Sequence, residues 1–112
     1  MKKPRQQPLI STVGERGDAY CSIDDELVGH AEAKFPKWPI DQIHGAGVLV
    51  EEAGETMQAA INHVYQGESD ERIEEEAIQT AAMAVRLIIW LRSRRRKEKM
   101  NHEIRKKKPV KR

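Results

Sequence analysis

Apolar residues recur every three or four positions in the middle of the chain, which predicts a helix from about residue 40 or 41 to residue 66. This spacing places them on one face of the helix, and we expect that face to be buried. The apolar positions are Val50, Ala53, Met57, Ala60, Ile61 and Val64. Gly67 follows them, and glycine commonly ends helices because it adopts the left-handed backbone conformation without strain.

A second stripe predicts another helix, which begins near Glu71 with Ser69 or Asp70 as its N-terminal cap. Its positions are separated by alternating steps of four and three residues, close to the seam of a coiled coil. They are Ile73, Ala77, Thr80, Ala84, Leu87 and Leu91. Because only a few residues separate the two helices, they should pack side by side as an antiparallel hairpin.

A shorter helix is predicted before the hairpin, over residues 23–35. Ser22 can cap its N-terminus, and Pro36 and Pro39 end it because proline lacks an amide donor and restricts the residue before it. Ahead of this helix, prolines and glycines without apolar periodicity indicate an irregular arm over residues 1–20.

The chain is expected to form one domain over residues 21–98, followed by a Lys-rich segment over residues 99–112 that we expect to be disordered. The sequence contains no strand pattern, internal repeat or glycine-rich phosphate loop. The predicted fold class is therefore all-α, an antiparallel helical hairpin plus an N-terminal helix.

The composition leans polar for a compact monomer of 112 residues, with 38% apolar and 34% charged residues. It fits either long helices with large solvated faces or a subunit that completes its core in an oligomer. No apolar run approaches the length of a membrane span, and the first ten residues lack the apolar core of a signal peptide. Cys21 is the only cysteine, which suits a reducing compartment, so we expect a soluble cytoplasmic protein.

Charge is distributed very unevenly along the chain. Residues 92–112 contain 12 Lys or Arg and two Glu, whereas residues 1–91 contain 8 basic and 16 acidic side chains. The basic segment either attracts phosphate groups or an acidic partner, or it complements a helix dipole and aids solubility. No aromatic residue interleaves it, so recognition of specific bases is not expected.

Acidic residues stand beside the apolar stripes of both hairpin helices. Glu52 and Glu55 are three residues apart, which places their carboxylates on one helical face, and Glu76 and Gln79 repeat this spacing. Like charges at this spacing repel each other, so they either point into solvent or share a cation. In a simple antiparallel hairpin Glu55 and Glu76 would differ in depth by about 9 Å, unless the turn between the helices removes the difference.

These residues resemble the motifs of the all-α, MazG-like nucleotide pyrophosphohydrolases, in which an EExxE helix is followed by an ExxD helix. The first motif reads Glu51-Glu52-Ala53-Gly54-Glu55 here, and the second reads Glu76-Ala77-Ile78-Gln79. The likeness extends to the flanking residues 47–50 and 80–87, and it covers about residues 41–90. The chain looks most similar to the small MazG-like proteins of phages and bacteria.

The resemblance implies an enzyme that uses Mg²⁺, or alternatively Mn²⁺, to hydrolyse a nucleoside triphosphate to a monophosphate and pyrophosphate. It implies Glu51, Glu52, Glu55 and Glu76 as catalytic residues, and Glu52, Glu55, Glu76 and Gln79 as metal ligands. The family's aspartate is Gln79 here, and an amide oxygen can bind a metal but supplies no charge and cannot act as a base. The resemblance also implies a homodimer or homotetramer built from four-helix-bundle units.

Four further residues are candidates for contacting the substrate. Arg86 lies two helical turns beyond Gln79 and could bind phosphate, or it could pair with acids on the helix surface. Lys37 is a weaker phosphate candidate, Trp38 could stack on a base or cap the core, and His44 could line the pocket or be structural.

Two other functional classes are consistent with helical glutamates or with the basic segment. A di-metal carboxylate oxidase would need Glu-x-x-His pairs on its helices, and the sequence contains none. A catalytically weakened helical bundle that binds nucleic acid or an acidic partner through residues 92–112 is the alternative that stays open.

Overall fold

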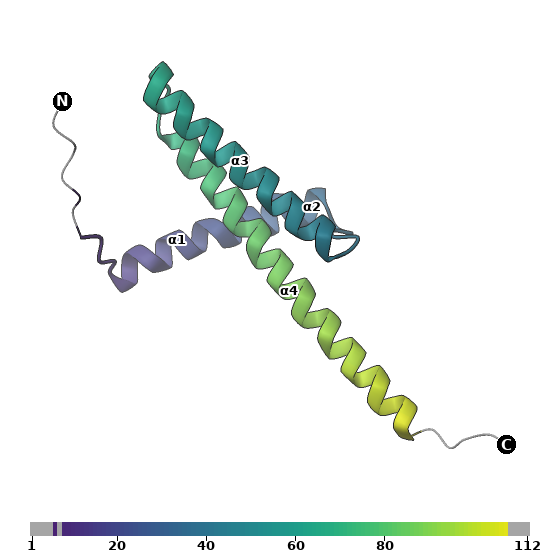
Figure 1. Cartoon of the computed structure of the whole chain (residues 1–112). Helices are drawn as coiled ribbons and strands as arrows, with labels where there is room; N and C mark the ends of the chain where they lie inside the picture. Colours follow the sequence, from purple (N-terminus) through teal and green to yellow (C-terminus); the bar gives the residue numbers. More distant parts are fainter. Residues whose placement is uncertain (1–5, 7, 108–112) are drawn as a thin grey trace.

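Helices form all of the regular secondary structure in the computed structural model, which describes residue 6 and residues 8–107. The elements are α1 (Val13–Glu26), the π-helical turn η1 (Leu27–Ala31), α2 (Glu32–Lys34), α3 (Gln42–Gln66) and α4 (Glu71–Lys107). The all-α prediction is confirmed, and α3 and α4 lie side by side as a hairpin (Figure 1).

Helix α1 begins well before the predicted start near Ser22. Thr12 Oγ1 accepts a hydrogen bond from the Glu15 amide at 3.1 Å, and Glu15 Oε1 accepts one from the Thr12 amide at 2.9 Å. This reciprocal pair is a capping box, and it starts the helix at Val13. The expected irregular arm is therefore wrong over residues 13–20, and its residues 1–5 and 7 lie outside the described part of the chain.

The helical path continues from α1 through η1 and α2 and ends at Lys34, with Phe35 as its C-cap, close to the predicted end. Leu27 and Ala31 are the buried residues of the π-helical turn. Pro36 follows at once, and a proline after the last turn cannot continue a helix. This stretch therefore delivers two apolar side chains to the hairpin and then turns sharply into α3.

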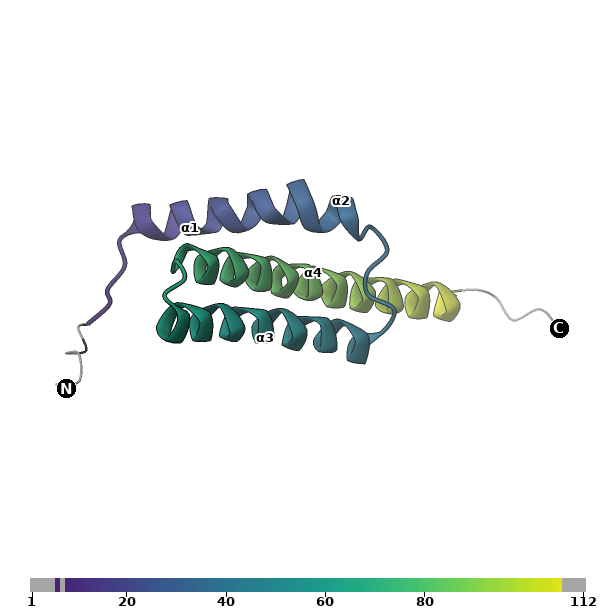
Figure 2. The same ribbon diagram turned by 90° about the horizontal axis from the view of Figure 1, so that it is seen from above.

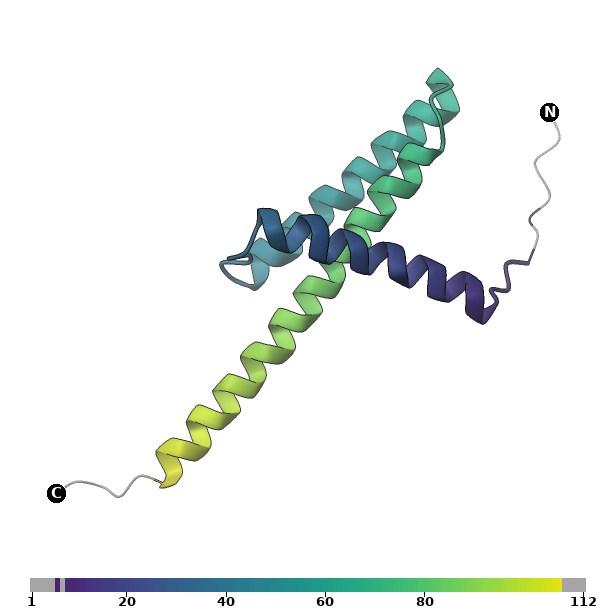
Figure 3. The same ribbon diagram turned by 180° about the vertical axis from the view of Figure 1, so that it is seen from behind.

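Helix α4 is the central element of the fold, because it contacts α3 on one side and α1 with η1 on another. Figure 2 shows α4 lying between α1 and α3, and Figure 3 shows α1 crossing it at a steep angle. The core lies where η1 meets the hairpin. It consists of the buried Leu27, Ala31, Ala82 and Met83, with Ile23, Trp38, Val48, Leu49 and Val85 packed around them.

The start of α3 approaches α4 and the preceding loop very closely. The Asp41 side chain accepts a hydrogen bond from the His44 amide at 2.7 Å and caps the helix. Gly45 is buried, and a Cβ there would lie 2.7 Å from Leu87 Cδ1 and 3.3 Å from Pro39 Cγ. A larger residue would require the Leu87 side chain to move, so Gly45 lets the start of α3 pack closely against α4 and the loop.

The predicted buried stripe of α3 faces outward in the single chain. Val50, Met57 and Val64 are 72%, 61% and 69% exposed. The face that α3 turns toward α4 instead contains buried or half-buried residues, namely His44, Gly45, Val48, Leu49, Glu52, Thr56 and Ala59. Polar residues that the sequence placed beside the stripe therefore lie in the interface between the helices.

The α4 stripe is also displaced from its predicted position. Ala77 is exposed, whereas Glu76, Ala82, Met83 and Arg86 are the buried residues of α4. The face that packs is thus rotated by about one residue, and it includes two charged side chains that apolar periodicity does not detect.

Helix α4 continues through residue 107, so the expected disorder from residue 99 is wrong as far as Lys107. Residues 108–112 of that segment lie outside the described part of the chain. Within the described residues no helix combines the length and the apolar character needed to cross a membrane.

Candidate metal centre

Three glutamates from the two hairpin helices converge on one point. Glu52 and Glu55 lie one turn apart on α3, and Glu76 lies on α4. One carboxylate oxygen from each residue lies within 4.8 Å of the other two. The structure therefore brings together three of the residues that the sequence predicted as metal ligands.

The connection between the helices removes the difference in depth that a simple hairpin would give. After Gly67 the chain runs back along the last turn of α3 before α4 begins (Figure 1). The Glu68 amide donates to the Asn62 carbonyl at 3.3 Å, and His63 Nδ1 lies 2.6 Å from the Glu68 carbonyl oxygen. Because α4 starts level with an earlier turn of α3, Glu76 lies opposite Glu52 and Glu55.

The acidic cluster contains carboxylate oxygens that are buried without a partner. Glu76 is only 6% exposed, and its Oε2 atom has no hydrogen-bond partner among the described residues. The Oε2 atom of the half-buried Glu52 is in the same situation. Arg72 lies 3.3 Å from Glu76 Oε1 and offsets part of the charge from a largely exposed position. A buried carboxylate oxygen without a donor is unfavourable, and a cation held between the three acids would satisfy it.

The electrostatics of the cluster lead to the same conclusion. Burial raises the pKa of the Glu76 carboxyl above its ordinary value, and the charge of Glu55 raises it further against the opposing effect of Arg72. Burial also raises the pKa of Glu52, with repulsion from Glu55 and Glu76 as the next causes. These carboxylates hold their negative charge at a cost in free energy, which a bound cation would reverse.

Two threonines link the helices beside the acidic cluster. Thr56 Oγ1 on α3 and Thr80 Oγ1 on α4 are 3.2 Å apart. Thr80 Oγ1 lies 2.8 Å from the Glu76 carbonyl oxygen, and Thr56 Oγ1 lies 3.3 Å from that of Glu52. Each hydroxyl has one proton, so Thr80 donates to the nearer carbonyl and Thr56 donates to Thr80 or to Glu52. The pair fixes the register at which Glu52 faces Glu76.

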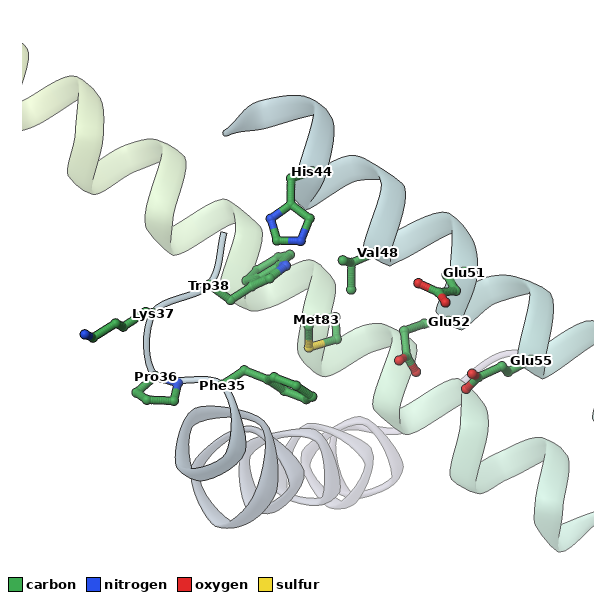
Figure 4. A pocket seen from close by; sticks show the side chains of 10 residues that line it. All are labelled: Phe35, Pro36, Lys37, Trp38, His44, Val48, Glu51, Glu52, Glu55 and Met83. Atoms are coloured by element: carbon green, nitrogen blue, oxygen red, sulfur yellow. The ribbon is translucent and has the colours of Figure 1, made fainter. Parts of the chain in front are cut away.

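A cavity of about 550 Å³ opens beside the acids, and its size and mixed lining are typical of a small-molecule site. Figure 4 shows the acids at one end and the rings of Phe35 and Trp38 toward the other. The lining residues are Phe35, Pro36, Lys37, Trp38, His44, Val48, Glu51, Glu52, Glu55 and Met83. The cavity thus joins an apolar, aromatic wall to a cluster of carboxylates.

Two hydrogen-bond donors belong to the aromatic end of the cavity. Trp38 Nε1 is buried and has no hydrogen-bond partner within the described part of the chain. His44 Nδ1 lies 3.0 Å from the Ile40 amide and accepts its hydrogen bond, so the neutral ring carries its proton on Nε2. The imidazole donor is therefore available to a ligand in the cavity, whereas Trp38 Nε1 is covered by the surrounding protein atoms.

The structure gives Arg86 a different role from the predicted phosphate contact. Its guanidinium donates to the Ala31 carbonyl at 3.1 Å and to the Phe35 carbonyl, and it lies 5.3 Å from the centre of the Trp38 ring. It lines a separate hollow rather than the cavity beside the acids. Burial lowers the pKa of Arg86 from its ordinary high value. Arg86 holds the end of α2 and Trp38 in place, so we assign it a positioning role.

The other predicted residues take less central positions. Glu51 is exposed and lines the cavity outside the group of three converging acids. Lys37 lines the cavity near Trp38, but its side chain points away from the acids (Figure 4). Gln79 is half-buried on α4, three residues after Glu76.

Sequence reasoning missed several residues of the site. Arg72, with Gln58 and Asn62, lines a second hollow of about 300 Å³ on the other side of Glu55 and Glu76. Its spacing of four residues from Glu76 was a readable signal for an ion pair. Phe35 and Met83 resembled core residues, and nothing in their spacing marked them as parts of a cavity wall.

Comparison of the chain with models of known protein families, with curated proteins and with solved structures returned no match.

Proposed function

We propose that this chain is a Mg²⁺-dependent nucleoside triphosphate pyrophosphohydrolase, which adds water across the bond between the α and β phosphates and releases a nucleoside monophosphate and pyrophosphate. One observation carries the proposal. Glu52, Glu55 and Glu76 converge at one end of a cavity with aromatic walls, and two of them bury an unpartnered oxygen among the described residues. A nucleoside triphosphate needs a cation site for its phosphates directly beside an apolar, aromatic surface for its base.

The donor set fits a hard divalent cation. Carboxylate oxygens are preferred ligands of Mg²⁺, and Mg²⁺ usually keeps several waters and shares its sites with substrate phosphates. Glu52, Glu55 and Glu76 would hold the ion, and Mn²⁺ suits the same oxygens. When bound, Mg²⁺ supplies neutralisation of the phosphate charge and makes water more acidic. Three carboxylates are enough to hold the ion, although Gln79 stands in place of a fourth acid.

The cavity suits the nucleoside half of the substrate. The Phe35 and Trp38 rings offer flat apolar surfaces for a base, and the proton of His44 Nε2 is a donor for its polar edge. Glu51 lines the same cavity and can accept a proton from an attacking water. Arg72, at the second hollow, forms an ion pair with Glu76 and is the candidate for binding the phosphates.

The test is pyrophosphate release from a panel of NTPs and dNTPs, with and without Mg²⁺. We compare wild type with Glu55→Gln and with a matched control, Glu74→Gln, whose side chain is exposed and outside the converging acids. We expect Mg²⁺-dependent turnover that falls by about 100-fold or more in Glu55→Gln and is retained in Glu74→Gln.

Release of inorganic phosphate instead of pyrophosphate would contradict the proposed cleavage site. Absence of Mg²⁺-dependent turnover across the panel, in protein shown by circular dichroism to be folded, would overturn the proposed activity. Equal loss of turnover in both glutamine variants would show that the converging acids are not its site.

A further inference from the structure

Helix α4 extends far beyond the body of the protein. From Arg95 to Lys107 every residue is exposed, and the helix runs past the other elements (Figures 1 and 3). Its ion pair, Arg94 with Glu98 at 3.4 Å, lies within the helix itself. The stretch from residue 92 to residue 107 is about 23 Å long at the rise of an α-helix. It is therefore an accessible rod and not a disordered tail.

Most cations of this rod lie on one face. At 3.6 residues per turn, six of its nine Lys and Arg side chains fall within an arc of about 120°. We call them the basic stripe, which comprises Arg92, Arg95, Arg96, Lys99, Lys106 and Lys107. Glu103 is the one acid in the same arc, whereas Arg94 and Arg105 lie on the opposite side with Glu98. The stripe therefore presents a strongly positive edge.

The basic stripe is unfavourable for an isolated helix. Arg92 and Arg96, and Arg95 and Lys99, are pairs of like charge four residues apart, which destabilise a helix by a few tenths of a kcal/mol each. Within the described residues no acidic side chain outside the helix forms an ion pair with it. A polyanion along the stripe would remove this repulsion.

The chemistry of the stripe favours double-stranded nucleic acid over other polyanions. Along a duplex each strand places a phosphate about every 3.4 Å, so the length of the stripe matches about six or seven phosphates. The major groove admits an α-helix. Only Met100 and Ile104 are apolar between residues 92 and 107, which is too little for insertion into a membrane surface. The same stretch has no Phe, Tyr or Trp ring on which unpaired bases could stack.

We propose that the basic stripe of α4 binds double-stranded nucleic acid through its phosphates, without preference for sequence. Arg92 lies 16 residues beyond Glu76, or about 24 Å along the helix, so the duplex stays clear of the candidate metal centre. Residues 1–91 carry an excess of eight acidic side chains, which repel a duplex and confine it to the extension.

Fluorescence anisotropy with a labelled random-sequence duplex tests this with the full chain. The stripe variant is Arg95→Gln with Lys106→Gln, and the matched control is Arg94→Gln with Arg105→Gln, which removes the same charge from the opposite side. The slope of log K against log salt should become shallower by about 1.8 in the stripe variant and change little in the control. Circular dichroism melts confirm that both variants are folded.

Three results would overturn the proposal. One is no duplex binding by wild type at low salt, and another is an equal change of slope in both variants. The third is tighter binding to phosphatidylserine–phosphatidylcholine vesicles than to the duplex at the same salt, which would assign the stripe to a membrane surface. Pyrophosphate release is measured in parallel, and it should be unchanged in the stripe variant because the stripe is distant from the acids.

Discussion

Glu76 contributes to the site at the expense of stability. It is a buried carboxylate with one oxygen near Arg72 and the other without a partner in the described structure. Burial and the nearby Glu55 raise its pKa in the folded protein, whereas in the unfolded chain the carboxyl is hydrated and isolated. The folded state therefore holds the proton of Glu76 more tightly than the unfolded state does.

This difference predicts how stability depends on pH when no metal is present. Below the unfolded pKa the residue is protonated in both states and carries no penalty. As pH rises from the unfolded pKa through the raised folded pKa, the folded state binds more protons, so the free energy of unfolding falls. Glu76→Gln removes the charge, so it should be more stable than wild type at pH 7 by about 1 kcal/mol or more, and similar to it near pH 4.

Denaturant unfolding at a series of pH values, with EDTA and then with Mg²⁺, measures the effect. If the ion binds the folded state through this carboxylate, as we propose, Mg²⁺ should stabilise wild type at pH 7 and leave Glu76→Gln nearly unaffected. Glu74→Gln is the control for loss of one acid from α4. A Glu76→Gln variant that is less stable than wild type at pH 7 without metal would show that the pair with Arg72 outweighs the cost of burial.

At the scale of elements, the sequence predicted the hairpin well because its signals are local. Gly67 ends α3 with a positive φ of 70°, and the Ser69 side chain accepts a hydrogen bond from the Glu71 amide at 3.2 Å where α4 begins. The start of α1 was missed although it also has a local signal, because the Thr12–Glu15 capping box lies among glycines that suggested an irregular arm. Local signals therefore locate helix ends, provided that a capping motif is considered together with the glycines around it.

The faces of the helices could not be predicted in the same way. Periodicity identifies an apolar stripe but does not state which surface covers it. In α3 the stripe containing Val50 and Met57 is exposed in the single chain, because the opposite face carries Glu52 and Thr56 against α4. Spacing alone left Glu55 and Glu76 about 9 Å apart in depth, and only the resemblance of the two motifs implied that Glu52, Glu55 and Glu76 share a site. The cavity wall at Phe35 depends on a loop whose path the sequence does not specify.

The contact between Thr56 and Thr80 predicts a testable effect on the metal centre. Thr56→Val keeps the shape of the side chain but removes the hydroxyl that links α3 to Thr80 or to the Glu52 carbonyl. We expect Mg²⁺ binding, measured by isothermal titration calorimetry, to weaken about tenfold because the register of Glu52 and Glu76 is loosened. Thr56→Ser keeps the hydroxyl and should bind Mg²⁺ as wild type does. Equal Mg²⁺ affinity in the valine and serine variants would show that the hydroxyl pair does not support the metal site.

Two surfaces of the described chain stand without a partner in the single copy. One is the basic stripe, and the other is the outward face of α3. On that face Ile43, Val50, Met57 and Val64 are spaced seven residues apart, which is the repeat of a coiled-coil position. Three residues after each of the first three positions comes an alanine, namely Ala46, Ala53 and Ala60. We propose that a second copy of the chain covers this face, as the expected homodimer or homotetramer requires.

Two glycines on the same helix support a close helix–helix contact. Gly47 and Gly54 lie seven residues apart, and a Cβ at either position would meet open space in the single chain. Each glycine costs the helix about 1 kcal/mol relative to alanine, and no contact among residues 8–107 explains it. Small residues at a repeated position allow a second helix to approach closely, so their placement beside Val50 and Met57 points to pairing through α3.

Substitution of two equally exposed methionines tests this pairing. Met57, on the outward face of α3, is 61% exposed, and Met100, on the α4 extension, is 60% exposed. Sedimentation equilibrium should show a dimer or tetramer for wild type and for Met100→Glu. Met57→Glu should be monomeric, because assembly would bury an unpaired charge in the seam. A monomeric wild type at the concentrations used would contradict the proposal directly. Dissociation by Met100→Glu but not by Met57→Glu would move the interface to the α4 extension, where it would compete with the duplex for the same helix.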